Sequence, residues 1–210
     1  MELDHISLRL LGCLIEKAMT TPDYYPMTVN ALTAAANQKT NRDPVESYTE
    51  AEVLDGINAL RELGLVRAVR SPGGRSAKYK HALDDMLEID DEQAALLAVL
   101  MLRGEQTSGE LRLRTERYDD FSTVEAVEEV LDGLERRDEP LARRLDRRPG
   151  EKESRYRHLL GEVGSTTRVE PALPDSAGTT PAPGAVDELG TLRARVEELE
   201  ARVAALEQAD

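Results

Sequence analysis

The chain has little of several residue types, and each shortage excludes something. Its 210 residues include no tryptophan, one phenylalanine and one cysteine. A single cysteine, Cys13, excludes an intramolecular disulfide and is typical of a reducing compartment. The longest nearly apolar run, residues 94–102, is far shorter than the roughly 20 residues that span a bilayer. The first residues read Met-Glu-Leu-Asp-His, without the apolar stretch of a signal peptide. We therefore expect a cytoplasmic protein with no membrane partner.

Signatures of catalysis and of cofactor binding are also lacking. The sequence has no zinc-ligand spacing, phosphate loop or dinucleotide fingerprint. Two of the three histidines, His81 and His158, lie 77 residues apart at equivalent positions of an internal repeat. This equivalence favours a structural role at the end of a strand over a catalytic role. Cys13 falls within a predicted helix, where a buried thiol is commoner than a nucleophile. The prediction is a protein that is not an enzyme and has no cofactor and no metal.

Two stretches of the chain repeat each other 77 residues apart. Residues 53–56 and 130–133 both read Val-Leu-Asp-Gly, while residues 78–81 read Lys-Tyr-Lys-His and residues 155–158 read Arg-Tyr-Arg-His. Twenty-one residues separate the two motifs in each copy. Chance similarity rarely keeps two motifs in one register, so the repeat indicates a duplicated domain.

Each copy predicts three helices followed by a β-hairpin. In the first copy the hairpin strands are residues 65–70 and 77–83, and in the second they are residues 141–147 and 154–160. This order is typical of a winged helix. We predict a mainly α fold with small β-hairpins (α+β), formed by winged-helix domains at residues 6–84 and 88–161. The helix signals are Ser7, Thr28, a Thr49–Glu52 capping box and Gly64 in the first copy, and Asp90, Thr107 and a Ser122–Glu125 capping box in the second.

The C-terminal part differs in composition. Residues 162–186 are rich in Gly, Ser, Thr and Pro and predict a disordered linker. Residues 187–207 carry a heptad repeat, which predicts a coiled-coil helix. The pairs Glu188–Arg193, Arg195–Glu200 and Arg202–Glu207 would attract in a parallel dimer, so we predict a parallel homodimer; a helix packing on its own body is the alternative. The predicted dimer contacts are Leu189, Leu192, Val196, Leu199, Val203 and Leu206.

The sequence resembles the YceH family of bacterial proteins over about residues 6–162. The most specific match is residues 37–45, which read Asn-Gln-Lys-Thr-Asn-Arg-Asp-Pro-Val. The resemblance implies a tandem winged-helix body, often followed by a coiled-coil tail, and no established activity. Further matching segments are Ile15-Glu16-Lys17, Thr20-Thr21-Pro22, Tyr25-Pro26, Lys78-Tyr79, Leu102-Arg103-Gly104, Gln106-Thr107, Gly109-Glu110-Leu111-Arg112 and Ser154-Arg155-Tyr156.

The charge pattern divides the chain. The net charge is −14, yet residues 61–80 hold six cations and one acid, and residues 140–160 hold seven cations and three acids. The predicted hairpins therefore suit phosphate, and each neutralised phosphate adds affinity through counterion release. The third helices do not suit phosphate, because residues 43–60 contain five acids, residues 118–135 contain seven acids, and neither range contains Lys or Arg. Helices that enter a DNA groove normally offer cations or amides to base edges.

We predict that the protein contacts the backbone of duplex DNA through its hairpins and the loops before the third helices, with little base readout. One alternative is that these cations only balance acidic faces in surface ion pairs. The other is a dimeric adaptor whose acidic helices bind a basic protein without DNA. The predicted nucleic-acid contacts are Lys39, Arg42, Arg67, Arg70, Arg75, Lys78, Lys80, Arg112, Arg114, Arg117, Arg147, Arg148, Lys152, Arg155 and Arg157.

Overall fold

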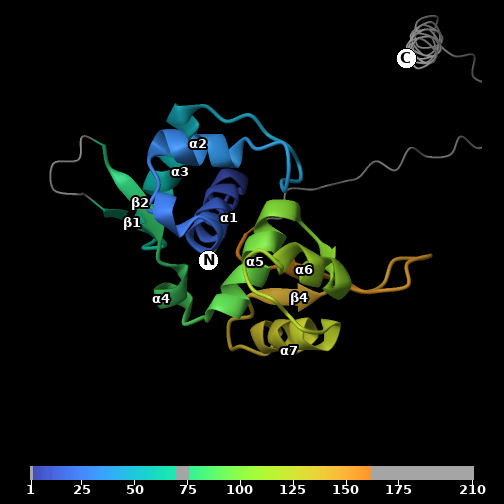
Figure 1. Ribbon diagram of the computed structural model, residues 1–210. Helices are drawn as coiled ribbons and strands as arrows, with labels where there is room; N and C mark the ends of the chain where they lie inside the picture. The colour runs from blue at the N-terminus through green and yellow to red at the C-terminus, as the bar shows by residue number, and fades with distance from the viewer. Residues whose placement is uncertain (1, 70–75, 162–210) are drawn as a thin grey trace, which may run out of the picture. The chain divides into compact units, whose positions relative to one another are not determined.

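The structure is a computed structural model that describes residues 2–69 and 76–161 (Figure 1). The predicted linker and heptad repeat lie outside the described residues, as do the predicted DNA contacts Arg70 and Arg75. The described residues are mainly helical with two small antiparallel sheets, so the predicted α+β class is confirmed. None of their helices has the length and apolar character needed to cross a membrane.

The first half of the described chain runs from α1 to β2. Most of its predicted helix signals are confirmed: Thr28 caps α2, and Thr49 with Glu52 forms a capping box at α3. Gly64 follows α3 with a φ of +76°, a backbone that favours glycine. The predicted Ser7 cap is wrong, because the Asp4 carboxylate accepts the Ser7 N–H at 2.8 Å. The elements are α1 (His5–Thr20), a 3₁₀ turn η1 (Pro22–Tyr24), α2 (Val29–Ala36), α3 (Glu50–Glu62), β1 (Val66–Val69) and β2 (Lys78–His81).

The second half repeats this order with two additions. A short helix, α4, and a two-residue strand, β3, were not predicted. The predicted Ser122–Glu125 capping box is wrong by one residue, since Thr123 is the cap and its hydroxyl accepts the Ala126 N–H at 3.2 Å. The elements are α4 (Leu83–Leu87), α5 (Asp91–Arg103), β3 (Gln106–Thr107), α6 (Ser108–Thr115), α7 (Val124–Glu135), β4 (Ala142–Arg144) and β5 (Arg155–His158).

The repeated tyrosines hold matching places in the two sheets. Tyr79 lies in β2 opposite Ala68 of β1, and Tyr156 lies in β5 opposite Arg144 of β4. Both rings are buried, as the alternation of side chains along a strand predicts. In the second sheet β3 pairs with the other edge of β5, giving the strand order β3-β5-β4. In the first, Met27 pairs with Tyr79 as an isolated bridge at the corresponding edge of β2.

Helices α1 and α5 lie side by side at the centre of the described residues (Figure 1). A Cβ atom on Gly12 of α1 would lie 2.9 Å from Leu102 Cγ and 3.3 Å from Met101 Cβ of α5. The absence of a side chain at Gly12 therefore allows the two helices to approach. Residues 94–102 of α5 are all buried, so the two halves share one continuous core.

Candidate nucleic-acid interface

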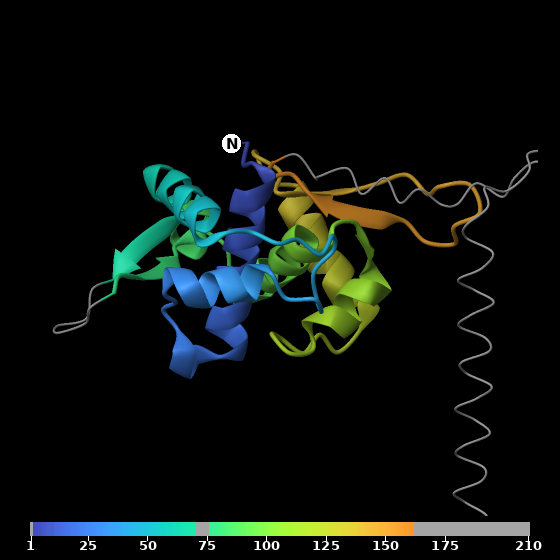
Figure 2. The same ribbon diagram turned by 90° about the horizontal axis from the view of Figure 1, so that it is seen from above.

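The second hairpin projects from the helices as a narrow finger, which is orange in Figure 2. Beyond β4 and β5 the ladder continues through a hydrogen bond of 2.7 Å from Leu145 N–H to Arg155 O. At the tip, Glu151 N–H donates to Arg148 O at 3.0 Å, and Gly150 has a φ of +89°. Gly150 after Pro149 meets the requirement of a type II turn for a positive φ at its third residue.

Two arginines lie opposite each other on the face of this finger away from the buried Tyr156; Arg143 is exposed, whereas Arg157 is half-buried and its Nε is buried without a hydrogen-bond partner among the described residues. Arg143 of β4 lies directly opposite Arg157 of β5 in the antiparallel register. Within the described part of the chain, neither guanidinium has a carboxylate within 4.0 Å. Like charges directly opposite each other destabilise a sheet. This pair therefore favours an anion that would relieve the repulsion.

The first hairpin has a similar pair, but an acid compensates it. Arg67 of β1 lies opposite Lys80 of β2, and Arg67 Nη1 is 2.8 Å from the Asp85 carboxylate of α4. The three charged groups are exposed, so this ion pair adds little stability. The cation pairs of the two hairpins thus differ in whether a described carboxylate compensates them, although the hairpins share a sequence motif.

Several predicted DNA contacts take part in ion pairs. Arg148 lies 2.6 Å from Glu105, and Arg155 lies 2.9 Å from Glu110. Arg114 and Arg117 also have carboxylate partners, at 3.7 Å and 3.1 Å. By contrast, no described carboxylate lies within ion-pair distance of a second group of predicted contacts. That group consists of Lys39, Lys78, Lys80, Arg112, Arg147, Lys152 and Arg157.

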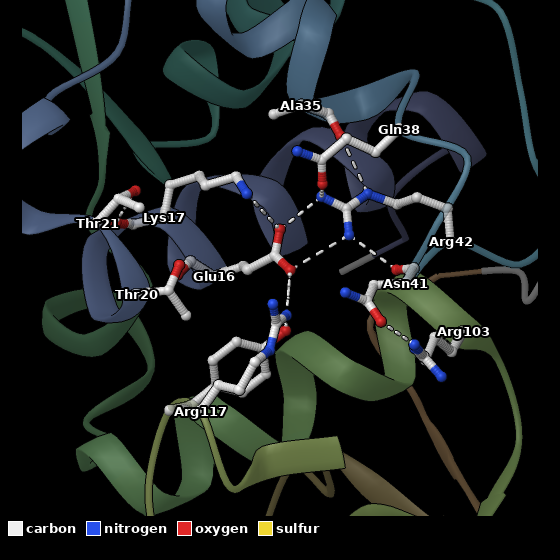
Figure 3. Close-up of polar contacts among 11 residues, drawn as sticks. Glu16, Lys17, Thr20, Thr21, Ala35, Gln38, Asn41, Arg42, Arg103 and Arg117 are labelled. Atoms are coloured by element: carbon white, nitrogen blue, oxygen red, sulfur yellow. Dashed lines mark hydrogen bonds and ion pairs between the residues drawn. The ribbon is translucent and has the colours of Figure 1, made fainter.

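Arg42 was predicted to contact nucleic acid, and this prediction is wrong because the side chain is buried. Figure 3 shows the polar groups that surround it. Its guanidinium binds the Glu16 carboxylate through both terminal nitrogens, at 2.5 Å and 3.4 Å. The remaining donors reach the carbonyl oxygens of Ala35 and Asn41 and the side chain of Gln38. Arg42 has no free donor for a phosphate, and binding one would require it to leave Glu16.

Glu16 receives donors from both halves of the chain (Figure 3). Arg117 and the Tyr118 hydroxyl, which follow α6, each donate to its carboxylate at 3.1 Å, and Lys17 Nζ lies 3.3 Å away. Burial alone would raise the pKa of Glu16, but the hydrogen bonds and the charge of Arg42 bring it below its usual value. We call Glu16, Arg42, Arg117 and Tyr118 the Glu16 cluster; it joins α1, the loop before α3 and the segment after α6.

The loop that carries the most specific sequence match docks on α5. Asp43 N–H donates to Leu102 O at 2.9 Å, and Arg103 donates to the Asn41 side chain. Lys39 is exposed in the same loop. Residues 37–45 therefore hold the two halves together, and within them Lys39 is the cation that faces solvent.

The third helices present acids to solvent, as the sequence predicts. Glu50, Asp55 and Glu62 are exposed on α3, and Glu125 and Glu129 are exposed on α7. Neither helix could approach a phosphate with these faces without repulsion. The described residues contain no group of three or more His, Cys, Asp or Glu side chains that could hold a metal ion, and burial raises the pKa of the Cys13 thiol to about 11.

Comparison with known proteins identifies relatives but no activity. A family model described as "Protein of unknown function, DUF480" matches residues 3–151. A UPF0502 protein of Citrifermentans bemidjiense is 44% identical, covering 99% of this chain and 92% of the relative. One from Geobacter metallireducens is 50% identical (75% and 72% covered), and one from Aliivibrio fischeri is 42% identical (91% and 92% covered). The chain therefore belongs to the DUF480 family of proteins of unknown function, whose relatives named above are UPF0502 proteins.

Proposed function

We propose that this protein is a non-enzymatic tandem winged-helix protein that binds the backbone of duplex DNA with little sequence preference. The observation that carries the proposal is the Arg143–Arg157 pair on the projecting second hairpin, which has no described carboxylate partner. A hairpin of this kind reaches the DNA backbone or minor groove in winged-helix proteins. Phosphates along the face of the finger that carries this pair would neutralise the two guanidinium groups.

The charges of the remaining elements support backbone contact over base readout. The exposed acids of α3 and α7 would repel phosphate if either helix entered the major groove. Affinity must then come from the cations of the hairpins. Lys39, in the loop before α3, and Arg112, in α6, would add to it. Binding of this kind is sensitive to salt, because the released counterions supply the driving force.

The test is fluorescence anisotropy of the full chain on a random duplex of about 30 base pairs, measured over a range of salt concentrations. We expect the double variant Arg143→Glu/Arg157→Glu to bind more than tenfold more weakly, with a salt slope smaller by about 2. The matched control, Arg61→Glu/Arg136→Glu, makes the same change in net charge at exposed positions at the C-terminal ends of α3 and α7 and should bind like the wild type. Equal loss in both variants, or no binding by the wild type at low salt, would refute the proposal.

A second candidate is a dimeric adaptor that binds a basic protein through the acidic faces of α3 and α7. The exposed carboxylates of Glu125 and Glu129, one helical turn apart, favour it. Replacing both residues by Gln would lower the affinity for such a partner and would leave the affinity for DNA unchanged or slightly higher. We also propose that the protein is a cytoplasmic homodimer and that YceH proteins are members of this same family.

A further inference from the structure

A polar hollow lies along the projecting hairpin, between the residues on either side of its turn and the first residues of α6 and α7. Its volume is about 400 Å³, and it is lined by the starts of α6 and α7 and by both arms of the finger. Since one water takes up about 30 Å³ of liquid, the space would hold roughly a dozen waters. A phosphate group with part of its hydration shell would fit.

Three cations and two carboxylates line this hollow. The cations are Arg144, Arg147 and Lys152, and the carboxylates are Glu128 and Glu153. Among the described residues, none of these five groups forms an ion pair. The Ser108 hydroxyl donates to Glu128 at 2.8 Å, which gives that carboxylate a partner within the protein. The cations have no such carboxylate partner, and the formal charge of the lining is positive.

The position of Arg144 is supported by the buried core. Its guanidinium lies 5.9 Å from the centre of the Tyr156 ring, which is 1% exposed. A cation over an aromatic face is attracted by the ring and loses conformational freedom there. Arg147 and Lys152 lie on opposite arms of the finger, and Arg144 lies on the same arm as Arg147, so both arms contribute cations to the hollow.

The starts of two helices reinforce the preference for an anion. Ser108 is the first residue of α6 and Val124 is the first residue of α7, and both line the hollow. The N-terminal end of a helix carries a partial positive charge and N–H groups without intrahelical partners; here the threonine caps accept the Glu110 and Ala126 N–H groups, so only the earlier amides remain. These ends add to the three cations without replacing them.

We propose that this hollow is a binding site for a phosphate group, held by Arg144, Arg147 and Lys152, and that its ligand is a backbone phosphate of duplex DNA. The inference rests on the proposed function and deepens it, because it distinguishes two phosphate-contacting sites on the same hairpin. Arg143 and Arg157 contact the backbone from one face of the finger, while the hollow seats a phosphate on the side of α7. Glu153 opposes binding, so neutralising it should tighten the site.

The experiment has two arms and uses the full chain. In the first, the ¹⁵N-labelled protein is titrated with inorganic phosphate at constant ionic strength, and amide shifts are followed by NMR. We expect saturable shifts at Ser108, Val124 and Lys152. The variant Arg147→Gln/Lys152→Gln should lose them, Arg143→Gln/Arg157→Gln should keep them, and Glu153→Gln should bind phosphate severalfold more tightly. The amide spectrum of each variant also reports whether it is folded.

In the second arm the same variants are tested on the random duplex by anisotropy. We expect Arg147→Gln/Lys152→Gln to bind about tenfold more weakly and to lower the salt slope by about 1, because the hollow holds one phosphate. If this variant binds the duplex normally while Arg143→Gln/Arg157→Gln binds it weakly, the hollow is not a phosphate site for DNA. The proposed function would still stand. Absence of saturable phosphate shifts at the hollow would overturn the site as well. Phosphate shifts in a protein that binds no duplex would overturn the proposed function and identify free phosphate as the ligand.

Discussion

At the scale of single residues, the same residue type has opposite roles in this chain. Arg42 and Arg157 are both arginines that the charge pattern assigns to DNA, yet Arg42 is buried against Glu16 whereas Arg157 has no described carboxylate partner. Local sequence could not separate them, because Glu16 lies 26 residues before Arg42 and receives Arg117 from 101 residues further along. One signal was present. Glu16 follows Gly12 by one helical turn on the buried face of α1, and a buried carboxylate requires a cation.

The Glu16 cluster gives a prediction about stability. Replacing Glu16 by Gln should lower the free energy of unfolding by about 3–5 kcal/mol near neutral pH, because Arg42 then stays buried without its counter-ion. The double variant Glu16→Leu/Arg42→Met should recover most of this loss. Urea unfolding followed by circular dichroism measures both, with Arg136→Gln, an exposed i,i+4 partner of Asp132, as the control that changes little.

The pH dependence provides a further check on the same variant. The folded pKa of Glu16 lies below the ordinary value of 4.5. Its contribution is therefore fully present above about pH 4.5 and is lost as the pH falls through the folded pKa. Glu16→Gln should lack this part of the acid destabilisation. A single variant as stable as the wild type at every pH would show that the cluster does not hold the halves together.

At the scale of elements, the longer helices and the hairpins were predictable because their periodicity and caps are local, whereas the five-residue α4 has no side-chain cap and was missed. Strand β3 was not predictable either, since two residues are too short for an alternating pattern and it exists through pairing with β5. The repeated Val-Leu-Asp-Gly motif also misleads about packing. A Cβ atom on Gly56 would lie 2.8 Å from Leu10 Cδ1, whereas one on Gly133 would meet no described atom within 4 Å apart from its chain neighbours and its own helix backbone. The same glycine therefore permits close helix packing only in the first half.

The start of α7 provides a test at this scale. Ser122 and Thr123 are both suitable caps by residue type, and the structure selects Thr123. Replacing Thr123 by Ala should lower the free energy of unfolding by about 1 kcal/mol, because the Ala126 N–H loses its acceptor. Ser122→Ala is the matched control, and we expect a change of a few tenths of a kcal/mol at most. Urea unfolding curves would refute the assigned cap if the two variants exchanged these effects.

At the scale of the whole molecule, the sequence predicted two similar halves but not how they join. The signal lay in residues 94–102, an apolar run whose length argues against a membrane span. A helix that is apolar all round is buried on all sides, and α5 is enclosed by α1 together with elements of its own half. The chain ends of this unit also meet, since Leu3 N–H donates to Leu160 O at 2.9 Å. The interface between the two halves depends on contacts between residues that are far apart in the sequence. No local sequence pattern predicts such contacts.

Assembly is the remaining prediction at this scale, and it rests on the heptad repeat outside the described residues. If residues 187–207 form a parallel coiled coil, charges at the d positions should separate the dimer. We expect Leu192→Glu/Leu199→Glu to convert a dimer of the full chain into a monomer by light scattering. The control Ala194→Glu/Ala201→Glu adds the same charge at f positions, which face solvent in a coiled coil, and should stay dimeric. A dimeric variant would contradict the coiled coil as the interface, and a monomeric wild type at high concentration would remove the dimer itself. DNA binding would then have to be explained by the two hairpins of one chain.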